Sequence, residues 1–139
     1  SPGRGAVMEP GTRDLVRSRS GGRCEYCLIR QENLKLAHHV EHIIARKHGG
    51  GDEESNLCLA CERCNLFKGS DLSGVDPESG EVVRLFHPRV QSWAEHFELR
   101  GPFIAGLTPC GRATVRVLSM NAGQRLQFRA ALIARGRYP

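Results

Sequence analysis

The residues best suited to acid–base and metal chemistry lie close together between positions 38 and 69. Histidines surround one carboxylate, and an asparagine and a CxxC motif follow: His38, His39, Glu41, His42, Asn56, and Cys61 with Cys64. An imidazole titrates near neutral pH and can take a proton from water. Carboxylate and carboxamide oxygens suit hard divalent cations. Their order indicates a single site folded from one short unit.

Four of the six cysteines form two CxxC pairs. Two such pairs can present four thiolates to one zinc ion, which predicts a structural Zn²⁺ site of Cys24, Cys27, Cys61 and Cys64. Two disulfides are the alternative, but they require export. A thioredoxin-like redox role needs only one CxxC. Because four thiolates leave no open coordination position, the chemistry is expected elsewhere.

The remaining cysteines and most histidines are expected to be structural. Cys58 is predicted to be a small buried residue, and Cys110 stands at a helix start, where a lowered pKa is conceivable. The histidines predicted to be packed or solvated are His38, His48, His87 and His96.

The pattern HVEHI, GG, NL and CxxCNxxKG over residues 23–71 resembles the HNH endonuclease motif, in the variant where asparagine replaces the last histidine. The segment from Leu85 to Pro139 is also similar to the C-terminal part of small stand-alone bacterial HNH proteins. The resemblance implies metal-dependent hydrolysis of phosphodiester bonds in DNA, with Mg²⁺ or another divalent cation. Such hydrolysis needs an activated water and charge relief on the phosphate.

The resemblance also implies individual roles. His42 matches the general base, and Glu41 and Asn65 match the two ligands of the catalytic cation. Asn56 matches the middle asparagine, which braces the loop by hydrogen bonds. The family usually has aspartate at the position of Glu41, so the cation would sit slightly differently here. Asn65 supplies an oxygen ligand, which suits Mg²⁺.

A regular strand would separate Glu41 from His42, because successive side chains point to opposite faces. The two can serve one phosphate only if the strand ends or bulges there. The loop that starts at Ala45 makes an end plausible. In a straight strand, His39 and Glu41 would be the rival metal pair.

The charge pattern favours a polyanionic partner. The net charge is +5 and the isoelectric point is about 9.1. Candidate phosphate contacts are Arg46, Arg63 and Lys68. The arginines of GRATVR and GQRLQFR indicate either a DNA-facing strip or, as the preferred interpretation, an amphipathic surface. The expected partner is DNA, with RNA left open.

The elements that must position these residues follow from local sequence. A helix is expected over residues 12–20, ended by Gly21 and Gly22. A strand over 36–44, a loop over 46–55, a short strand over 57–60 and a helix over 62–68, ended by Gly69, come next. The segment 75–86 predicts a hairpin that turns at Ser79 and Gly80.

The C-terminal part is expected to be mainly helical. The segment 88–99 predicts either a short helix or an edge strand. Thr108 and Pro109 predict the start of a helix. Asn121 is expected to cap a last helix that closes at Gly136. Its predicted inward face, crossed by an arginine, consists of Leu126, Arg129, Leu132 and Ile133.

These predictions combine into an α+β fold. A treble-clef-like ββα-metal unit of HNH type is stapled by the Cys₄ zinc site, and a β-hairpin and C-terminal helices pack on it. With 139 residues the chain has the size of one domain. We expect a single domain over residues 11–139, with the core motif at 23–71 and a helical extension at 101–139.

The N-terminus and the location are further expectations. Residues 1–10 are expected to be flexible or added, with Met8 as a candidate native start. No apolar run approaches a membrane span, and no signal-peptide segment is present, so the predicted location is cytoplasmic.

A different class of function also fits a zinc-stapled unit. The alternative is a non-catalytic treble-clef module that binds nucleic acid or protein. The intact set of Glu41, His42, Asn56 and Asn65 favours the nuclease, because a binding module does not need it. Sequence specificity, nicking against double-strand cleavage, oligomeric state and biological role stay open.

Overall fold

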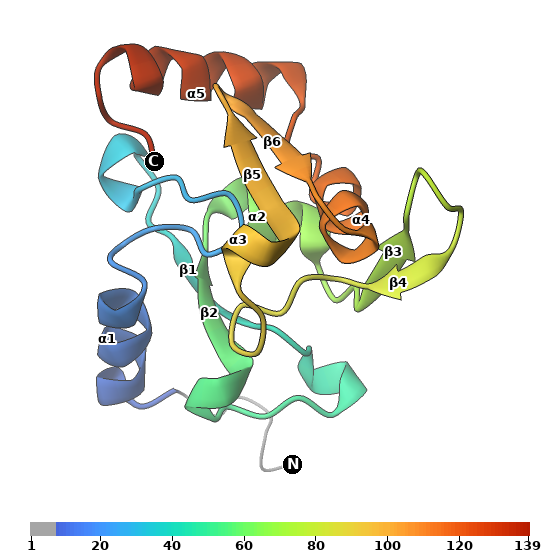
Figure 1. Cartoon of the computed structure of the whole chain (residues 1–139). Helices are drawn as coiled ribbons and strands as arrows, with labels where there is room; N and C mark the ends of the chain where they lie inside the picture. The colour runs from blue at the N-terminus through green and yellow to red at the C-terminus, as the bar shows by residue number, and fades with distance from the viewer. Residues whose placement is uncertain (1–7) are drawn as a thin grey trace.

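The computed structural model describes residues 8–139 and has an α+β architecture (Figure 1). No helix in this range is long and apolar enough to cross a membrane. The elements in chain order are α1 (Pro10–Arg19), η1 (Gln31–Asn33), β1 (His39–His42), η2 (Arg46–His48), η3 (Glu54–Asn56), β2 (Leu57–Ala60), α2 (Glu62–Lys68), β3 (Ser73–Val75), β4 (Val82–Arg84), α3 (Trp93–His96), β5 (Phe97–Arg100), β6 (Phe103–Gly106), α4 (Pro109–Val117) and α5 (Gly123–Ala134), where η marks a 3₁₀ turn.

The predicted order of strand, loop, strand and helix is confirmed between residues 39 and 68. β1 pairs with β2 in antiparallel register, with Glu41 opposite Cys58 and His42 opposite Leu57. α2 follows β2 after Cys61. β1 is shorter than the predicted strand over 36–44, because the backbone N–H of His38 is bonded to the side chain of Gln31. The predicted loop contains η2 and η3.

Helix α1 covers the β1–β2 hairpin, and the prediction of a helix here is confirmed. Its only buried residue, Val16, packs with Met8, Leu57 and Leu59 in a small apolar cluster. Arg19 donates to the carbonyl of Leu57 at 2.6 Å. Of the N-terminal segment predicted to be flexible, residues 1–7 lie outside the described residues.

The rest of the chain adds two hairpins and two longer helices around a second, larger core. β3 pairs with β4, and β5 pairs with β6. The hairpin predicted at Ser79 and Gly80 is confirmed, and its turn is fastened to α4 by two hydrogen bonds from Arg112 to the buried Asp76. The segment 88–99 contains both α3 and the start of β5, so the two alternatives follow one another along the chain.

Of the two residues predicted at helix starts, Thr108 caps its helix and Asn121 does not. The Thr108 hydroxyl accepts from the N–H of Gly111 at 3.0 Å, as a capping residue at the start of α4 should. Asn121 does not cap α5, and that prediction is wrong. Its side chain bonds instead to both backbone groups of Ile104 in β6.

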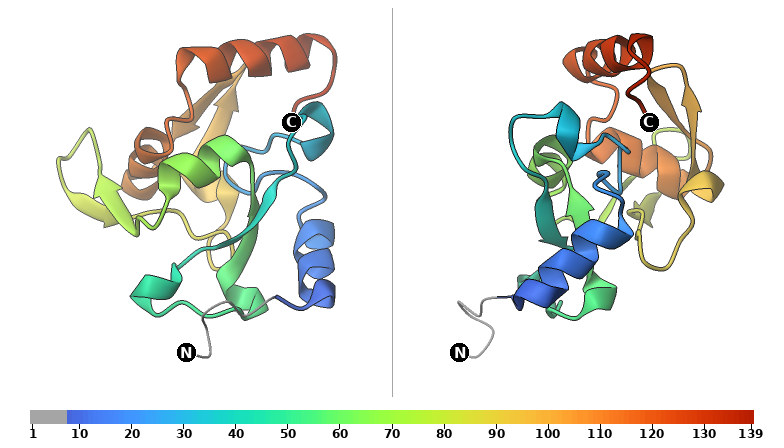
Figure 2. Two further views of the ribbon diagram at one scale, coloured as in Figure 1. Left: turned by 180° about the vertical axis from the view of Figure 1, so that it is seen from behind. Right: turned by 90° about the vertical axis from the view of Figure 1, so that its left-hand side faces the viewer.

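The predicted inward face of α5 is confirmed at Arg129 and Leu132 but not at Leu126 and Ile133. Arg125, Arg129 and Leu132 are buried, whereas Ile133 is 38% exposed. The predicted end at Gly136 is confirmed, since Gly136 adopts a φ of 69° there. Helix α5 lies at one end of the molecule and the loop between β1 and β2 lies at the other, as the rotated views show (Figure 2).

Candidate active site and metal centre

Strand β1 ends at His42, so the chain leaves the strand directly after the neighbouring Glu41 and His42. Glu41 is half-buried, and burial raises the pKa of its carboxyl group, while nearby Lys68 opposes this shift. Lys68 belongs to α2, and Asn65 lies one turn earlier on the same side of that helix. The carboxylate of Glu41 is therefore near Lys68 of α2, and its pairing with Asn65 stays a prediction.

Lys68 is buried rather than displayed to solvent. Its ammonium group donates to the carbonyl of Ile43 at 2.8 Å, and only 4% of the residue is exposed. Burial lowers the pKa of Lys68, while the nearby Glu41 carboxylate raises it. Lys68 thus ties α2 to the first residue after β1. Its role as a phosphate contact stays a prediction.

His42 has a carboxylate partner in the following loop. Its Nε2 lies 2.7 Å from Oδ1 of Asp52, and 20% of the His42 side chain is exposed. Arg46 donates to both oxygens of Asp52, at 2.9 and 3.2 Å. The hydrogen bond from His42, together with those from Arg46, lowers the pKa of Asp52. In sequence, Asp52 is the first of three consecutive acids in the loop predicted over residues 46–55.

Asn56 fastens that loop to the end of β1. Its side chain accepts from the N–H of Ile44 at 2.9 Å and donates to the carbonyls of Ile44 and Gly51 at 3.0 and 2.9 Å. Its backbone carbonyl also accepts from the N–H of Ile43. Asn56 is buried, so these bonds compensate its desolvation.

The three glycines before Asp52 allow the loop to fold so tightly. Gly49 has a φ of 91°, which favours glycine. A side chain on Gly50 would meet the carbonyl oxygen of Ile44 at 1.7 Å. The loop therefore turns back against β1, and Asp52 comes within reach of His42.

The two CxxC motifs form one buried cluster. The Sγ atoms of Cys24, Cys27, Cys61 and Cys64 all lie within 4.8 Å of one another. In the described part of the chain, this is the only such group of three or more histidine, cysteine, aspartate or glutamate residues. Tetrahedral zinc with Zn–S bonds of about 2.3 Å needs neighbouring sulfurs about 3.8 Å apart. The separation of Cys27 and Cys61, 3.7 Å, fits that geometry.

The electrostatics of the cluster also suit a cation. Hydrogen bonds from Cys24 and its neighbours lower the pKa of Cys27 and Cys61. Burial raises the pKa of Cys24 and Cys64. Four thiolates in one buried site repel each other, so full ionisation requires a bound cation. The arrangement is consistent with a zinc-stapled HNH ββα unit.

A buried arginine of α5 contacts this cluster, and sequence reasoning missed it. Arg125 lies 3.1 Å from the sulfur of Cys64 and donates to the carbonyl of Leu118 at 2.7 Å. Tyr138 adds a bond to the carbonyl of Cys27 at 2.6 Å. In sequence, Arg125 belongs to GQRLQFR, whose arginines favour an amphipathic surface. No local signal marks Arg125 as a buried residue.

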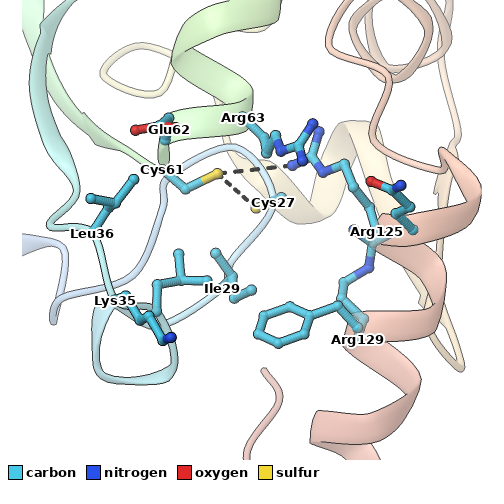
Figure 3. Close-up of a pocket in the computed structure, with 12 residues that line it drawn as sticks. Cys27, Ile29, Lys35, Leu36, Cys61, Glu62, Arg63, Arg125 and Arg129 are labelled. Carbon is cyan, nitrogen blue, oxygen red and sulfur yellow. Dashed lines mark hydrogen bonds between the residues drawn. The ribbon is translucent and has the colours of Figure 1, made fainter.

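Arg63 lines a groove beside the cysteines (Figure 3). The groove has a volume of about 430 Å³ and lies between the start of α2, the segment around Leu36 and the first half of α5. Neither Glu41 nor His42 lines it. The structure therefore places Arg63 with Arg125 and two of the cysteines, on a groove that Glu41 and His42 do not line.

Two further cysteines and His38 are buried or half-buried, whereas His39 is not. Cys58 is buried, as predicted, and burial raises its pKa to about 12. Cys110 is half-buried, and burial raises its pKa, so a lowered value at the helix start is wrong. His38 is packed, with Nε2 at 2.9 Å from the carbonyl of Ile29. His39 is exposed on β1.

Comparison with known proteins matches the segment that carries these residues. Residues 24–71 match the family model described as HNH endonuclease, so this segment is an HNH endonuclease family domain and the resemblance is confirmed. The family implies nuclease activity and a nucleic-acid substrate.

A curated relative is similar over much of the chain. The Septu protein PtuB of Bacillus thuringiensis is 27% identical over 121 residues, which cover 82% of this chain and 42% of that protein. The chain thus spans less than half the length of this relative. No solved structure matches the chain significantly.

Proposed function

We propose that the protein is a metal-dependent endonuclease that hydrolyses phosphodiester bonds in DNA. The observation that supports it best is the end of β1, where Glu41 lies toward α2 and His42 lies toward the loop braced by Asn56. A non-catalytic zinc module would not need these residues together.

In this proposal the chain supplies the base and the oxygen ligands. Glu41 and Asn65 would hold a divalent cation, which when bound stabilises charge on the scissile phosphate and the departing oxygen. Their carboxylate and carboxamide oxygens suit Mg²⁺. His42 takes a proton from the attacking water. The carboxyl group of Glu41, whose pKa is raised by burial, would ionise more readily beside a cation.

The other residues support this centre. Asn56 holds the loop, and the four cysteines would hold a structural zinc ion that fastens the first CxxC to α2. Among the candidate phosphate contacts, Arg46 shares Asp52 with the proposed base His42. Arg63 would contact DNA only on the groove side of α2.

Cleavage of supercoiled plasmid in Mg²⁺ or Mn²⁺ tests the proposal. We expect His42→Ala to lower the cleavage rate by about 10²- to 10⁴-fold, because it removes the base. His48→Ala is the matched control, since His48 is an exposed histidine in the same loop. Leaving out the divalent cation is a better control than EDTA, which would also compete for the cysteine site.

Two outcomes would contradict the proposal. Wild-type rates in folded His42→Ala would show that His42 is not the base. A wild-type protein that cuts neither DNA nor RNA with any divalent cation, yet binds them, would favour the binding module.

A further inference from the structure

Asp52 contacts the proposed base, His42, directly. The roles proposed above for Glu41, His42 and Asn65 give Asp52 no part in the reaction. Its Oδ1 lies 2.7 Å from Nε2 of His42 and 2.9 Å from the guanidinium of Arg46, which also reaches Oδ2 at 3.2 Å. The Asp52 side chain is 35% exposed. Solvent can therefore reach the Asp52 carboxylate, although His42 and Arg46 both bind it.

The chemistry of this contact determines where the imidazole proton sits. An ionised carboxylate can only accept hydrogen bonds, and a neutral imidazole carries one N–H and one lone pair. Nε2 must therefore carry the proton when it faces Asp52. The lone pair is then on Nδ1, which becomes the only ring atom able to accept a proton from water.

The loop is built to keep Asp52 in this place. Asn56 binds the carbonyl of Gly51, the residue immediately before Asp52, and both backbone groups of Ile44, two residues after His42. One buried side chain thus joins the two backbone segments that carry the pair. Arg46 also donates to the Asp52 carboxylate.

We propose that Asp52 is a positioning residue that fixes the ring and the tautomer of His42, so that Nδ1 is the base. This inference rests on the proposed nuclease function. Water gives a proton to Nδ1, its oxygen forms a bond to phosphorus, and the bond from phosphorus to the leaving oxygen breaks. That oxygen then takes up a proton from solvent. Asp52 accepts from Nε2–H throughout and stabilises the imidazolium.

A pair of single substitutions tests this role in the full chain. We expect Asp52→Ala to lower kcat by at least about 10-fold with little change in KM, as for other residues that orient a catalytic histidine. Glu54→Ala is the matched control, because Glu54 is an exposed acid of the same loop. A thermal melt of each variant checks the fold.

A readout without substrate separates this inference from the nuclease proposal. In protein labelled with ¹⁵N-histidine, the ring nitrogens of His42 should show the Nε2–H tautomer in wild type and in Glu54→Ala. Asp52→Ala should shift them toward a mixture. If wild type does not cleave nucleic acid, the nuclease proposal fails, and this spectrum still decides whether Asp52 holds the ring.

Three results would overturn the inference. The first is an Nδ1–H tautomer of His42 in wild type, and the second is an unchanged spectrum in folded Asp52→Ala. The third is wild-type kcat in Asp52→Ala under conditions in which His42→Ala is inactive.

Discussion

At the residue scale, Asn56 shows how a single side chain organises the candidate site. It uses both its oxygen and its nitrogen on backbone groups of two loop segments, and it is 6% exposed. The sequence identified Asn56 through the family pattern, and the structure gives its partners. We therefore expect Asn56 to affect activity indirectly, because it holds the loop in its conformation.

Replacement of Asn56 should destabilise the fold as well as the site. In Asn56→Ala, backbone groups of Ile44 and Gly51 lose their partner, at a cost of about 1–3 kcal/mol in the free energy of unfolding. Urea denaturation measures this loss. Ser55→Ala, an exposed neighbour in the same turn, should unfold at the wild-type midpoint. Equal midpoints for both variants would contradict the bracing role.

The contact between Asp52 and His42 could not be predicted from residue types. In sequence, Asp52 is one of several acids beside three glycines, which is typical of a solvated loop. The contact depends on the backward turn at Gly49, where φ is positive, and at Gly50, where the backbone passes too close to Ile44 for any side chain. That geometry depends on tertiary packing, which the local pattern does not contain.

At the element scale, α5 is joined to the cysteine cluster by an arginine. A tetrathiolate with Zn²⁺ would carry a net charge of −2, and Arg125 places a buried cation 3.1 Å from one sulfur. Charge-assisted hydrogen bonds of this kind are stronger than neutral ones. The helix and the metal site should therefore stabilise one another.

Loss of this contact should weaken zinc retention. We expect Arg125→Leu to release zinc to a chromogenic chelator roughly 10-fold faster than wild type, because the thiolates lose their charge partner. Arg135→Leu, at the exposed end of the same helix, is the control and should behave like wild type. Equal release rates for Arg125→Leu and wild type would show that Arg125 only packs.

The elements themselves were predictable where the signals were local. The helix start at Thr108 and Pro109, the turn at Ser79 and Gly80 and the end at Gly136 depend on neighbouring residues only. Asn121 failed as a cap because Ile104, far away in sequence, offers two backbone partners to its side chain. Long-range competition of this kind is outside any local rule.

At the scale of the whole molecule, the cysteine cluster and the loop of the candidate active site lie at opposite ends of the β1–β2 hairpin. The cysteine cluster lies toward α5, and the loop with Asp52 lies at the opposite end (Figure 2). The sequence predicted the α+β class from its local patterns and its resemblance to HNH proteins, and it predicted the Cys₄ cluster from the two CxxC motifs. The contacts of Arg112 with Asp76 and of Arg125 with the cysteine cluster were not predictable, since arginine is usually a surface residue.

The most direct test is to locate the catalytic cation in a crystal soaked with Mn²⁺ and a non-cleavable oligonucleotide. We predict an anomalous peak at about 2.0–2.5 Å from side-chain oxygens of both Glu41 and Asn65, with His42 facing the scissile phosphate. A peak held by His39 and Glu41, or bound phosphate with no cation near Asn65, would contradict the proposed site.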